Sequence, residues 1–397
     1  MGMKQPLEDI RVLDLSRVYA APEGSMILAD LGADVIRVEA PDGTDSMRDW
    51  GPFMNGESTY YFCANRNKRS ITLNLKEEKG REIFLKLVET ADVVIENFKT
   101  GTMERMGLGY ENLKAVNEQI ILCSVTGYGQ TGPYKHEPGF DPVIQALSGL
   151  MDVTGPPDGE PTKVGIPIAD ILTGKFVAIS ILAAIRQRDF TKKGQHIDLS
   201  LLDVQMSSMA NIASAYLNTG MLSKRLGNRH NNVVPYQVFA CADQPIMICA
   251  GNNRLFRRLC HVLKKPEWAE DERYRTNALR LKNQEELIAG ISAIVRTKPA
   301  DEWLALLSEH QIPAAKVNNI AQAFEHPQVK ARELVETLHH PKIGGIKMMK
   351  SPLRFSGLNV ASKYPPPLLG EHTEEVLLEE LGMSPGELRE LRERRVI

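Results

Sequence analysis

Strand-like and helix-like segments alternate along the first 200 residues of the chain, and this alternation constrains the fold more than any other feature. Short apolar runs bounded by turn residues predict strands at residues 10–15, 33–38, 71–75, 92–95 and 120–125. Between them, apolar residues spaced three and four apart predict helices at 22–31, 77–90 and 110–117. This alternation is typical of βαβ units around a parallel sheet, so we expect an α/β fold.

The segments that follow the predicted strands are the first candidates for a binding site. They cover residues 16–21, 39–42, 96–101 and 126–132. In parallel sheets of this kind, ligands bind at the carboxyl ends of the strands. We therefore expect a ligand to lie against these segments.

The pattern changes after about residue 140. Helices are predicted at 141–151, 170–186 and 201–217, and a polar stretch at 220–232 is typical of a linker. Alternation around a turn predicts a hairpin at 238–250, and helical patterns then continue to about residue 325. These segments indicate a second, smaller α+β domain. Two short strand signals at 343–355 and a charged helical tail at 371–394 follow.

The composition excludes several classes of partner. The 48 Lys and Arg residues nearly balance the 50 Asp and Glu residues, which leaves a formal net charge of −2. We therefore expect neither nucleic acid nor an anionic membrane as a partner. The longest mainly apolar stretch, residues 176–185, is shorter than the roughly 20 residues of a membrane span. Because the N-terminus has no apolar signal region, a cytoplasmic location is expected.

No motif for a tightly bound cofactor stands where this fold would need it. Residues 127–132 fit the G-x-G-x-x-G pattern, but Pro133 follows them in place of a helix. The loop after the first strand, residues 16–24, lacks that pattern, which disfavours an NAD-linked oxidoreductase. The chain has no G-x-S-x-G or H-E-x-x-H sequence, and its five cysteines show no zinc spacing. We expect no metal, and covalent chemistry is left to a carboxylate.

One carboxylate stands out by its position. Asp170 follows four small or apolar residues and stands at the start of a predicted helix. An aspartate there often serves as an N-cap that accepts backbone N–H bonds. The same position also presents an ionised carboxylate at the positive end of a helix, as a nucleophile requires. Both interpretations stay open on these residues alone.

An ordered series of motifs resembles the family III CoA-transferases, the group that includes the formyl-CoA and carnitine CoA-transferases. The resemblance spans essentially the whole chain. In the first half its motifs are residues 12–16, 31–39, 67–70, 96–98, 105–107 and 127–133. Further on, Pro167-Ile168-Ala169-Asp170 and the Pro-Pro-Pro-Leu-Leu-Gly-Glu-His run at 365–372 complete the series.

The resemblance implies a large Rossmann-like domain built from both chain ends, a smaller α+β domain, and an interlocked, ring-through-ring homodimer. On this basis residues 1–200 form the first part of a CoA-binding domain, 201–230 a linker helix and loop, and 231–325 the small domain. Residues 326–397 form a return segment and a C-terminal helix that complete the large domain. The resemblance also implies that Asp170 is the nucleophile, that acyl-CoA thioesters and small carboxylic acids are the substrates, and that no cofactor is tightly bound.

The resemblance further implies a set of binding residues. For CoA they are Val18, Leu73, Asn97, Phe98 and Arg105, with Lys68 and Arg69 as further candidates for the phosphates. Arg105 suits this role because a guanidinium matches phosphate oxygens; a surface charge at a helix end is the alternative. Asp141 is a candidate second active-site carboxylate, with loop capping as its alternative.

Departures from the formyl-CoA enzymes narrow the substrate class. Their tetraglycine loop is missing, which disfavours exchange between formate and oxalate. Residues 225–230, 234–239 and 250–253 resemble the short members that act on dicarboxylates, including enzymes that use succinyl-CoA with hydroxymethylglutarate and acetyl-CoA with oxalate. The second carboxylate of such an acceptor needs a cation. Arg225, Arg229 and His230 are the candidates, and a solvated linker is the alternative.

Two other functions share the CoA site. An acyl-CoA racemase or epimerase of the same superfamily needs an acid and a base on opposite faces of the substrate. Phe140 stands where the racemases carry a histidine, and a phenyl ring cannot transfer a proton. A non-catalytic CoA-ester binding protein would have no need of Asp170. We therefore expect a CoA-transferase, with succinyl-CoA as the favoured donor.

Overall fold

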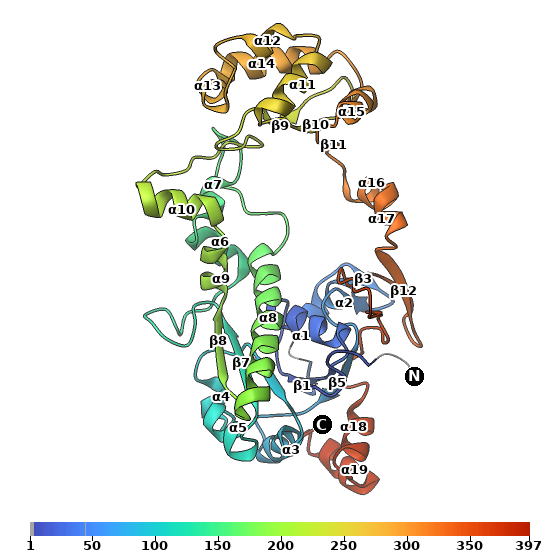
Figure 1. Cartoon of the computed structure of the whole chain (residues 1–397). Coiled ribbons are helices and arrows are strands. Elements are labelled where there is room, and N and C mark those ends of the chain that lie inside the picture. The colour runs from blue at the N-terminus through green and yellow to red at the C-terminus, as the bar shows by residue number, and fades with distance from the viewer. Residues whose placement is uncertain (1–3, 44) are drawn as a thin grey trace. The chain divides into compact units, whose positions relative to one another are not determined.

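The computed structural model describes residues 4–43 and 45–397, and the chain divides into two compact units (Figure 1). The first unit contains Met1–Leu150, Val164–Ala213 and Arg332–Ile397. The second contains Met151–Lys163 and Ser214–Ala331. Both units therefore combine segments that are distant in the sequence.

A six-stranded parallel sheet forms the centre of the first unit. Its order is β5-β2-β1-β6-β7-β8. The strands are β1 (Arg11–Asp14), β2 (Asp34–Glu39), β5 (Lys68–Thr72), β6 (Val93–Glu96), β7 (Ile121–Thr126) and β8 (His196–Ser200). Numbered within the sheet this is 3-2-1-4-5-6, the Rossmann order, with the direction of winding reversed between β1 and β6. The predicted parallel α/β fold is confirmed, whereas β8 was not predicted.

Helices cover both faces of this sheet. Neighbouring residues of β1 point to opposite faces, so Val12 joins one apolar core and Leu13 the other. One face carries α1 (Ala20–Asp30), α8 (Ile168–Thr191) and α9 (Leu201–Ser207). The other carries α3 (Glu78–Val88), α5 (Tyr110–Val116), α18 (Thr373–Glu379) and α19 (Pro385–Glu393). The C-terminal segment thus contributes to the core of the first unit.

Helix α8 is longer than the sequence pattern indicates. It has 24 residues and is long and apolar enough to cross a membrane by length and composition alone. In this structure one face of α8 packs into the apolar core against α1, β7 and β8, and the opposite side leaves Ile179 and Phe190 exposed. The approach to α1 is close, because a Cβ built on Gly24 would lie 2.5 Å from the side chain of Val177. Glycine is therefore the residue that fits there.

Several shorter elements complete the first unit. They are the 3₁₀ helix Ser46–Asp49, β3 (Phe53–Met54), β4 (Glu57–Ser58), α2 (Thr59–Phe62), α4 (Thr102–Arg105), α6 (Asp141–Leu147), β12 (Val335–His340) and β13 (Gly344–Met349). Of the two strand signals predicted at 343–355, only the first coincides with a strand, β13, which pairs with the unpredicted β12. The single helix predicted at 201–217 is broken: α10 (Ala210–Thr219) begins separately at Ala210, where φ is 44°.

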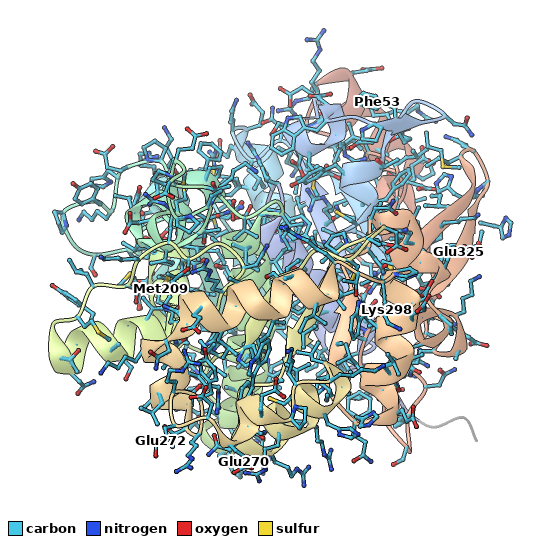
Figure 2. All side chains as sticks on the ribbon, turned by 90° about the horizontal axis from the view of Figure 1, so that it is seen from above. Phe53, Met209, Glu270, Glu272, Lys298 and Glu325 are labelled. Carbon is cyan, nitrogen blue, oxygen red and sulfur yellow. The ribbon has the colours of Figure 1, made fainter. Side chains whose placement is uncertain are left out.

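The second unit has its own sheet and core. Strands β9 (Tyr236–Phe239), β10 (Ile246–Cys249) and β11 (Ala314–Lys316) form an antiparallel sheet, so the predicted hairpin is confirmed. Helices α11 (Asn253–Val262), α12 (Glu267–Glu270), α13 (Asn277–Lys282), α14 (Gln284–Val295) and α15 (Ala300–Glu309) surround it. Charged side chains such as Glu270 and Glu272 face solvent (Figure 2).

Candidate active site

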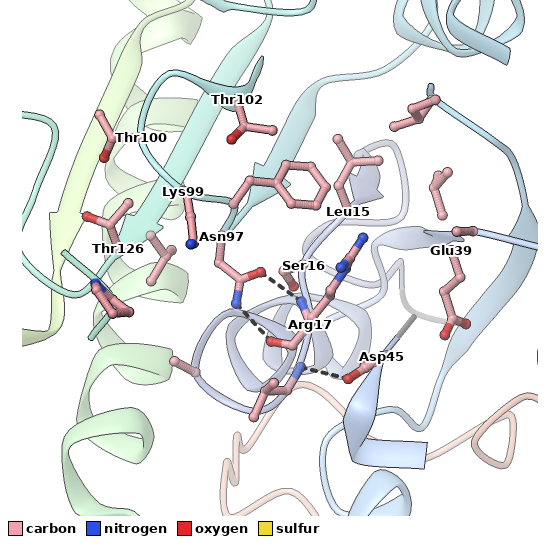
Figure 3. A pocket seen from close by; sticks show the side chains of 18 of the residues that line it. Leu15, Ser16, Arg17, Glu39, Asp45, Asn97, Lys99, Thr100, Thr102 and Thr126 are labelled. Atoms are coloured by element: carbon pink, nitrogen blue, oxygen red, sulfur yellow. Dashed lines mark hydrogen bonds between the residues drawn. The ribbon is translucent and has the colours of Figure 1, made fainter. Parts of the chain in front are cut away.

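A cavity of about 1000 Å³ lies in the first unit at the carboxyl ends of the parallel strands. Its wall includes residues 15–20 after β1, 38–42 after β2, 73–76 after β5, 97–100 after β6 and 125–127 after β7 (Figure 3). These segments overlap all four strand ends that the sequence singled out. The loops after β1 and β6 flank the point where the strand order reverses, which is where open α/β sheets bind their ligands.

The loop after β1 is held in an unusual backbone conformation. Val18 has φ 61°, a region that branched residues rarely occupy. The side chain of Asn97 bonds to both backbone groups of Arg17, the residue before Val18. Its Oδ1 accepts the Arg17 N–H at 2.9 Å, and its Nδ2 donates to the Arg17 carbonyl at 2.8 Å (Figure 3). Asp45 accepts the Val18 N–H at 3.1 Å. These hydrogen bonds fix the shape of the loop.

The turn after β6 is fixed in a similar way. The buried carboxylate of Glu96 accepts the backbone N–H of Phe98 at 2.8 Å, and burial raises the pKa of Glu96 to about 7. The guanidinium of Arg17 lies 5.3 Å from the centre of the Phe98 ring. An aromatic ring and a cation side by side suit a nucleotide base and its phosphates.

Most of the residues predicted to bind CoA meet at this cavity. Val18, Leu73, Asn97 and Phe98 all line it. Arg105 does not, but it ends helix α4 between the lining residues Thr102 and Met106, and its guanidinium donates to Thr102 Oγ1 at 2.8 Å.

The two further phosphate candidates lie elsewhere. Lys68 is completely buried, and its ammonium donates to Asp14, Asn65 and the Pro22 carbonyl. Burial lowers the pKa of Lys68 to about 8. Because all three donors of its ammonium are engaged inside the core, Lys68 has no contact to offer a phosphate.

Arg69 is also committed to protein partners. Its guanidinium forms ion pairs with Asp34, Glu375 and Glu380. It joins β5 to the C-terminal helices and does not line the cavity. For Lys68 and Arg69 the structure therefore indicates a role in folding instead of phosphate binding.

Cations other than Lys68 and Arg69 line the cavity. Arg17, Lys76, Lys99, Lys135 and Arg395 line it, and none of them was predicted. Arg17 and Lys99 fall inside strand-end segments that the sequence had marked, so the signal for these two was present. Burial lowers the pKa of Arg17. A CoA molecule carries three phosphate groups, which such a set of cations can neutralise.

Asp170 lines the same cavity and stands in the first turn of α8. The N-cap of α8 is Pro167, so the N-cap interpretation of Asp170 is wrong. Among residues 4–43 and 45–397, no hydrogen bond or ion pair engages its carboxylate. Burial raises the pKa of Asp170 to about 7, and the carboxylates of Asp141 and Glu23 add to the rise. A desolvated carboxylate without partners is a strong nucleophile when ionised.

Asp141 serves as the cap that Asp170 does not provide. Its Oδ1 accepts the backbone N–H of Ala169 at 2.8 Å, and its Oδ2 accepts a hydrogen bond from Gln145 Nε2 at 2.7 Å. Gln145 Oε1 in turn accepts the Val164 N–H at 2.8 Å. Asp141 therefore has a capping role, and the helix that it caps is the one that carries Asp170.

The candidates for the acceptor carboxylate all belong to the second unit. Arg225 donates to the carbonyl and the carboxylate of Asp152, and Arg229 pairs with Glu285. His230 Nδ1 accepts the Asn232 N–H, and its ring stands edge-on to Tyr236 at 5.2 Å. These side chains hold the linker together within their own unit. In the described part of the chain, no group of three or more His, Cys, Asp or Glu side chains is arranged to hold a metal.

The strand order, the cavity at its reversal point and the carboxylate in the first turn of α8 form an arrangement typical of α/β enzymes that bind nucleotide-like ligands. Residues 7–373 match the model of the CoA-transferase family III. The chain belongs to this family and is a CoA-transferase.

Individual relatives agree with this assignment. The chain is 42% identical over 388 residues to a mouse succinyl-CoA:glutarate CoA-transferase, a match that covers 98% of this chain and 89% of the relative. It is 39% identical to the acetyl-CoA:oxalate CoA-transferase of Acetobacter aceti, covering 89% and 90%. A CaiB/BaiF family protein of known structure from Brucella suis shares 41% identity with a TM-score of 0.86, covering 95% and 100%.

Proposed function

We propose that this CoA-transferase moves CoA from an acyl-CoA, with succinyl-CoA favoured, to a small dicarboxylate through covalent intermediates on Asp170. The observation that carries the proposal is the unpartnered carboxylate of Asp170 in the same cavity as Val18, Leu73, Asn97 and Phe98. The relatives named for succinyl-CoA with glutarate and for acetyl-CoA with oxalate support this substrate class.

The first half of the reaction transfers CoA to the enzyme. The ionised Asp170 carboxylate attacks the carbonyl of the donor thioester, an O–C bond forms, and the C–S bond breaks. This gives a mixed anhydride and the CoA thiolate. The thiolate then attacks the aspartyl carbonyl of the anhydride and expels the donor acid as its carboxylate. An aspartyl-CoA thioester remains on Asp170.

The second half repeats these steps with the acceptor. The acceptor carboxylate attacks the aspartyl-CoA thioester, giving a new anhydride and again the thiolate. Attack of the thiolate on the acceptor carbonyl releases the new acyl-CoA and frees Asp170. Thioester energy is conserved throughout, so the chemistry needs no ATP. Both intermediates hydrolyse if water reaches them. Productive transfer therefore requires a cavity that excludes water during the reaction.

Recognition of the acceptor and assembly belong to the same proposal. Arg225, Arg229 and His230 remain the candidates for binding the free carboxylate of the acceptor. We also retain the interlocked homodimer, the four-part division of the chain and a cytoplasmic location. The exposed apolar residues Ile179 and Phe190 of α8, 56% and 70% accessible in a single chain, support a covering subunit. Light scattering should then give twice the 44.2 kDa of one chain.

The racemase alternative lacks support at the cavity wall. Phe140 lines the cavity at the position where the racemases carry a histidine. A racemase would exchange the α-proton of an acyl-CoA for solvent deuterium and leave no adduct on the protein. A binding protein would do neither.

Intact-protein mass after brief exposure to succinyl-CoA tests the proposal. Wild type is expected to gain a CoA-sized adduct, and Asp170→Ala none. Asp203→Ala is the matched control, because Asp203 also stands in the first turn of a helix and is exposed. A panel of carboxylic acids then ranks acceptors by the rate at which they discharge the adduct. An adduct that persists in Asp170→Ala, or deuterium exchange without an adduct, would overturn the proposal.

A further inference from the structure

A buried glutamate stands beside the helix that carries Asp170. Glu23 belongs to α1 and is 5% exposed. One of its oxygens, Oε1, forms an ion pair with Lys175 of α8. The other, Oε2, is buried and has no hydrogen-bond partner. A buried carboxylate oxygen without a donor is costly, so its retention calls for an explanation.

Gly174 allows this glutamate to approach α8. A Cβ built on Gly174 would lie 2.9 Å from Glu23 Oε2, 3.0 Å from Glu23 Cβ and 2.7 Å from the Ala20 carbonyl oxygen. Gly174 follows Asp170 by four residues, which places it one turn further along the same face of the helix. The unpartnered oxygen therefore lies against the face of α8 that carries Asp170.

The charges around these two carboxylates come from several elements. Asp170 is influenced by Asp141 at the start of α6 and by Glu23 of α1. The phenol groups of Tyr19 and Tyr60 belong to the same cluster, since the charge of Asp170 contributes to raising the pKa of each.

Glu23 has two cations near it. Burial raises the pKa of Glu23, while Lys175 and Arg66 oppose the rise. Arg66 is itself paired with Asp30, and the side chain of Lys175 is 45% exposed. Water therefore screens Lys175, and within the described residues no cation is paired with Asp170.

We propose that Glu23 is a positioning residue whose charge destabilises the free Asp170 carboxylate and thereby favours its acylated forms. This inference rests on the proposed function. Attack by Asp170 turns a negative carboxylate into a neutral anhydride and then a neutral thioester, while the charge leaves on the departing thiolate or acid. Repulsion from Glu23 acts in the free state and disappears in both intermediates. Glu23 therefore shifts the balance toward the enzyme-bound CoA thioester.

The test compares Glu23→Gln, Glu23→Asp and wild type. The first removes the charge and keeps the volume, and the second keeps the charge but draws it back toward α1. For each we measure the pH profile of adduct formation and the adduct fraction at a fixed ratio of succinyl-CoA to succinate. We expect the apparent pKa of the profile to fall in the order wild type, Glu23→Asp, Glu23→Gln. A total fall of about half a unit to one unit corresponds to a threefold to tenfold smaller ratio of adduct to free enzyme.

Asp92→Asn is the matched control. Asp92 forms an ion pair with Arg188 near the other end of α8, so its loss disturbs the same helix without changing the charge near Asp170. Its profile should coincide with that of wild type. If Glu23→Gln fails to fold, Glu23→Asp still predicts a smaller shift of the same sign. Profiles that coincide for all Glu23 variants would overturn this inference alone, whereas absence of any adduct on wild type would overturn the proposed function.

Discussion

The hydrogen-bond chain from Asp141 through Gln145 to Val164 predicts that one substitution lowers the thermal stability and that a second one restores it. In Asp141→Asn, the new amide oxygen still accepts the Ala169 N–H, but the new NH₂ group faces Gln145 Nε2, so two donors meet. Gln145 cannot turn its amide, because its Oε1 accepts the Val164 N–H. Both side chains are buried, at 7% and 0% exposure. One unsatisfied buried donor costs about 2 kcal/mol, which lowers the melting temperature by about 4–8 °C.

A second substitution restores the pairing of donor and acceptor between positions 141 and 145. In Asp141→Asn/Gln145→Glu, the new asparagine donates to the new glutamate, which still accepts the Val164 N–H through its other oxygen. All three hydrogen bonds are kept and only the charge has moved. Calorimetry should show most of the lost melting temperature recovered, and the rate of adduct formation on Asp170 should recover with it.

The outcomes of this pair are distinct. A single variant as stable as wild type, or a double variant no more stable than the single one, would refute the hydrogen-bond chain. Recovery of stability without recovery of the adduct rate would refute the purely positional role of Asp141. The negative charge at position 141 would then be required by the chemistry itself.

Three further predictions concern the nucleophile, the cavity and the helix packing. Since burial raises the pKa of Asp170 to about 7 and only the ionised carboxylate attacks, adduct formation should rise about tenfold from pH 6 to pH 8 and then level off; a flat profile followed by mass spectrometry would contradict this. Arg17→Gln removes a cation from the cavity wall and should raise KM for the acyl-CoA about tenfold with kcat nearly unchanged, whereas an equal fall in kcat would point to a role in the transition state. Gly24→Ala places a methyl group 2.5 Å from Val177 and should cost about 1–3 kcal/mol, seen as a lower melting temperature; an unchanged one would mean that α1 and α8 can separate without loss.

The sequence predicts the location of the cavity well, because strand periodicity is a local property. Four of the parallel strands were placed within about a residue of their observed ends, and the polar segments after them line the cavity. In a parallel sheet these ends must meet at one edge, so the site follows from the order of elements. Arg17 and Lys99 lie in these strand-end segments, so the sequence could have predicted them as cavity residues. They were not among the predicted CoA-binding residues.

Whether an individual charged side chain lines the cavity or pairs inside the protein could not be predicted in this way. Lys68 and Arg69 look like phosphate ligands in a motif, but their partners Asp14 and Asp34 come from other strands. Whether a lysine is a free cation or a buried donor depends on which carboxylate the fold brings beside it. Arg395, which lines the cavity from the far end of the chain, gave no local signal for the same reason.

The supply of hydrogen-bond donors separates the three carboxylates at the start of α8. Within the part of the chain that the structure describes, Asp141 has both oxygens engaged, Glu23 has one, and Asp170 has neither. A carboxylate that capped its own helix would be stabilised by about 1 kcal/mol as the anion, and its pKa would fall, so it would be a weaker nucleophile. By assigning the cap to Asp141 on another helix, the fold satisfies the backbone at the start of α8 and leaves Asp170 without donors. In the sequence, the place of Asp170 at a helix start suggested a capping role that would weaken it as a nucleophile. The structure assigns that capping role to Asp141.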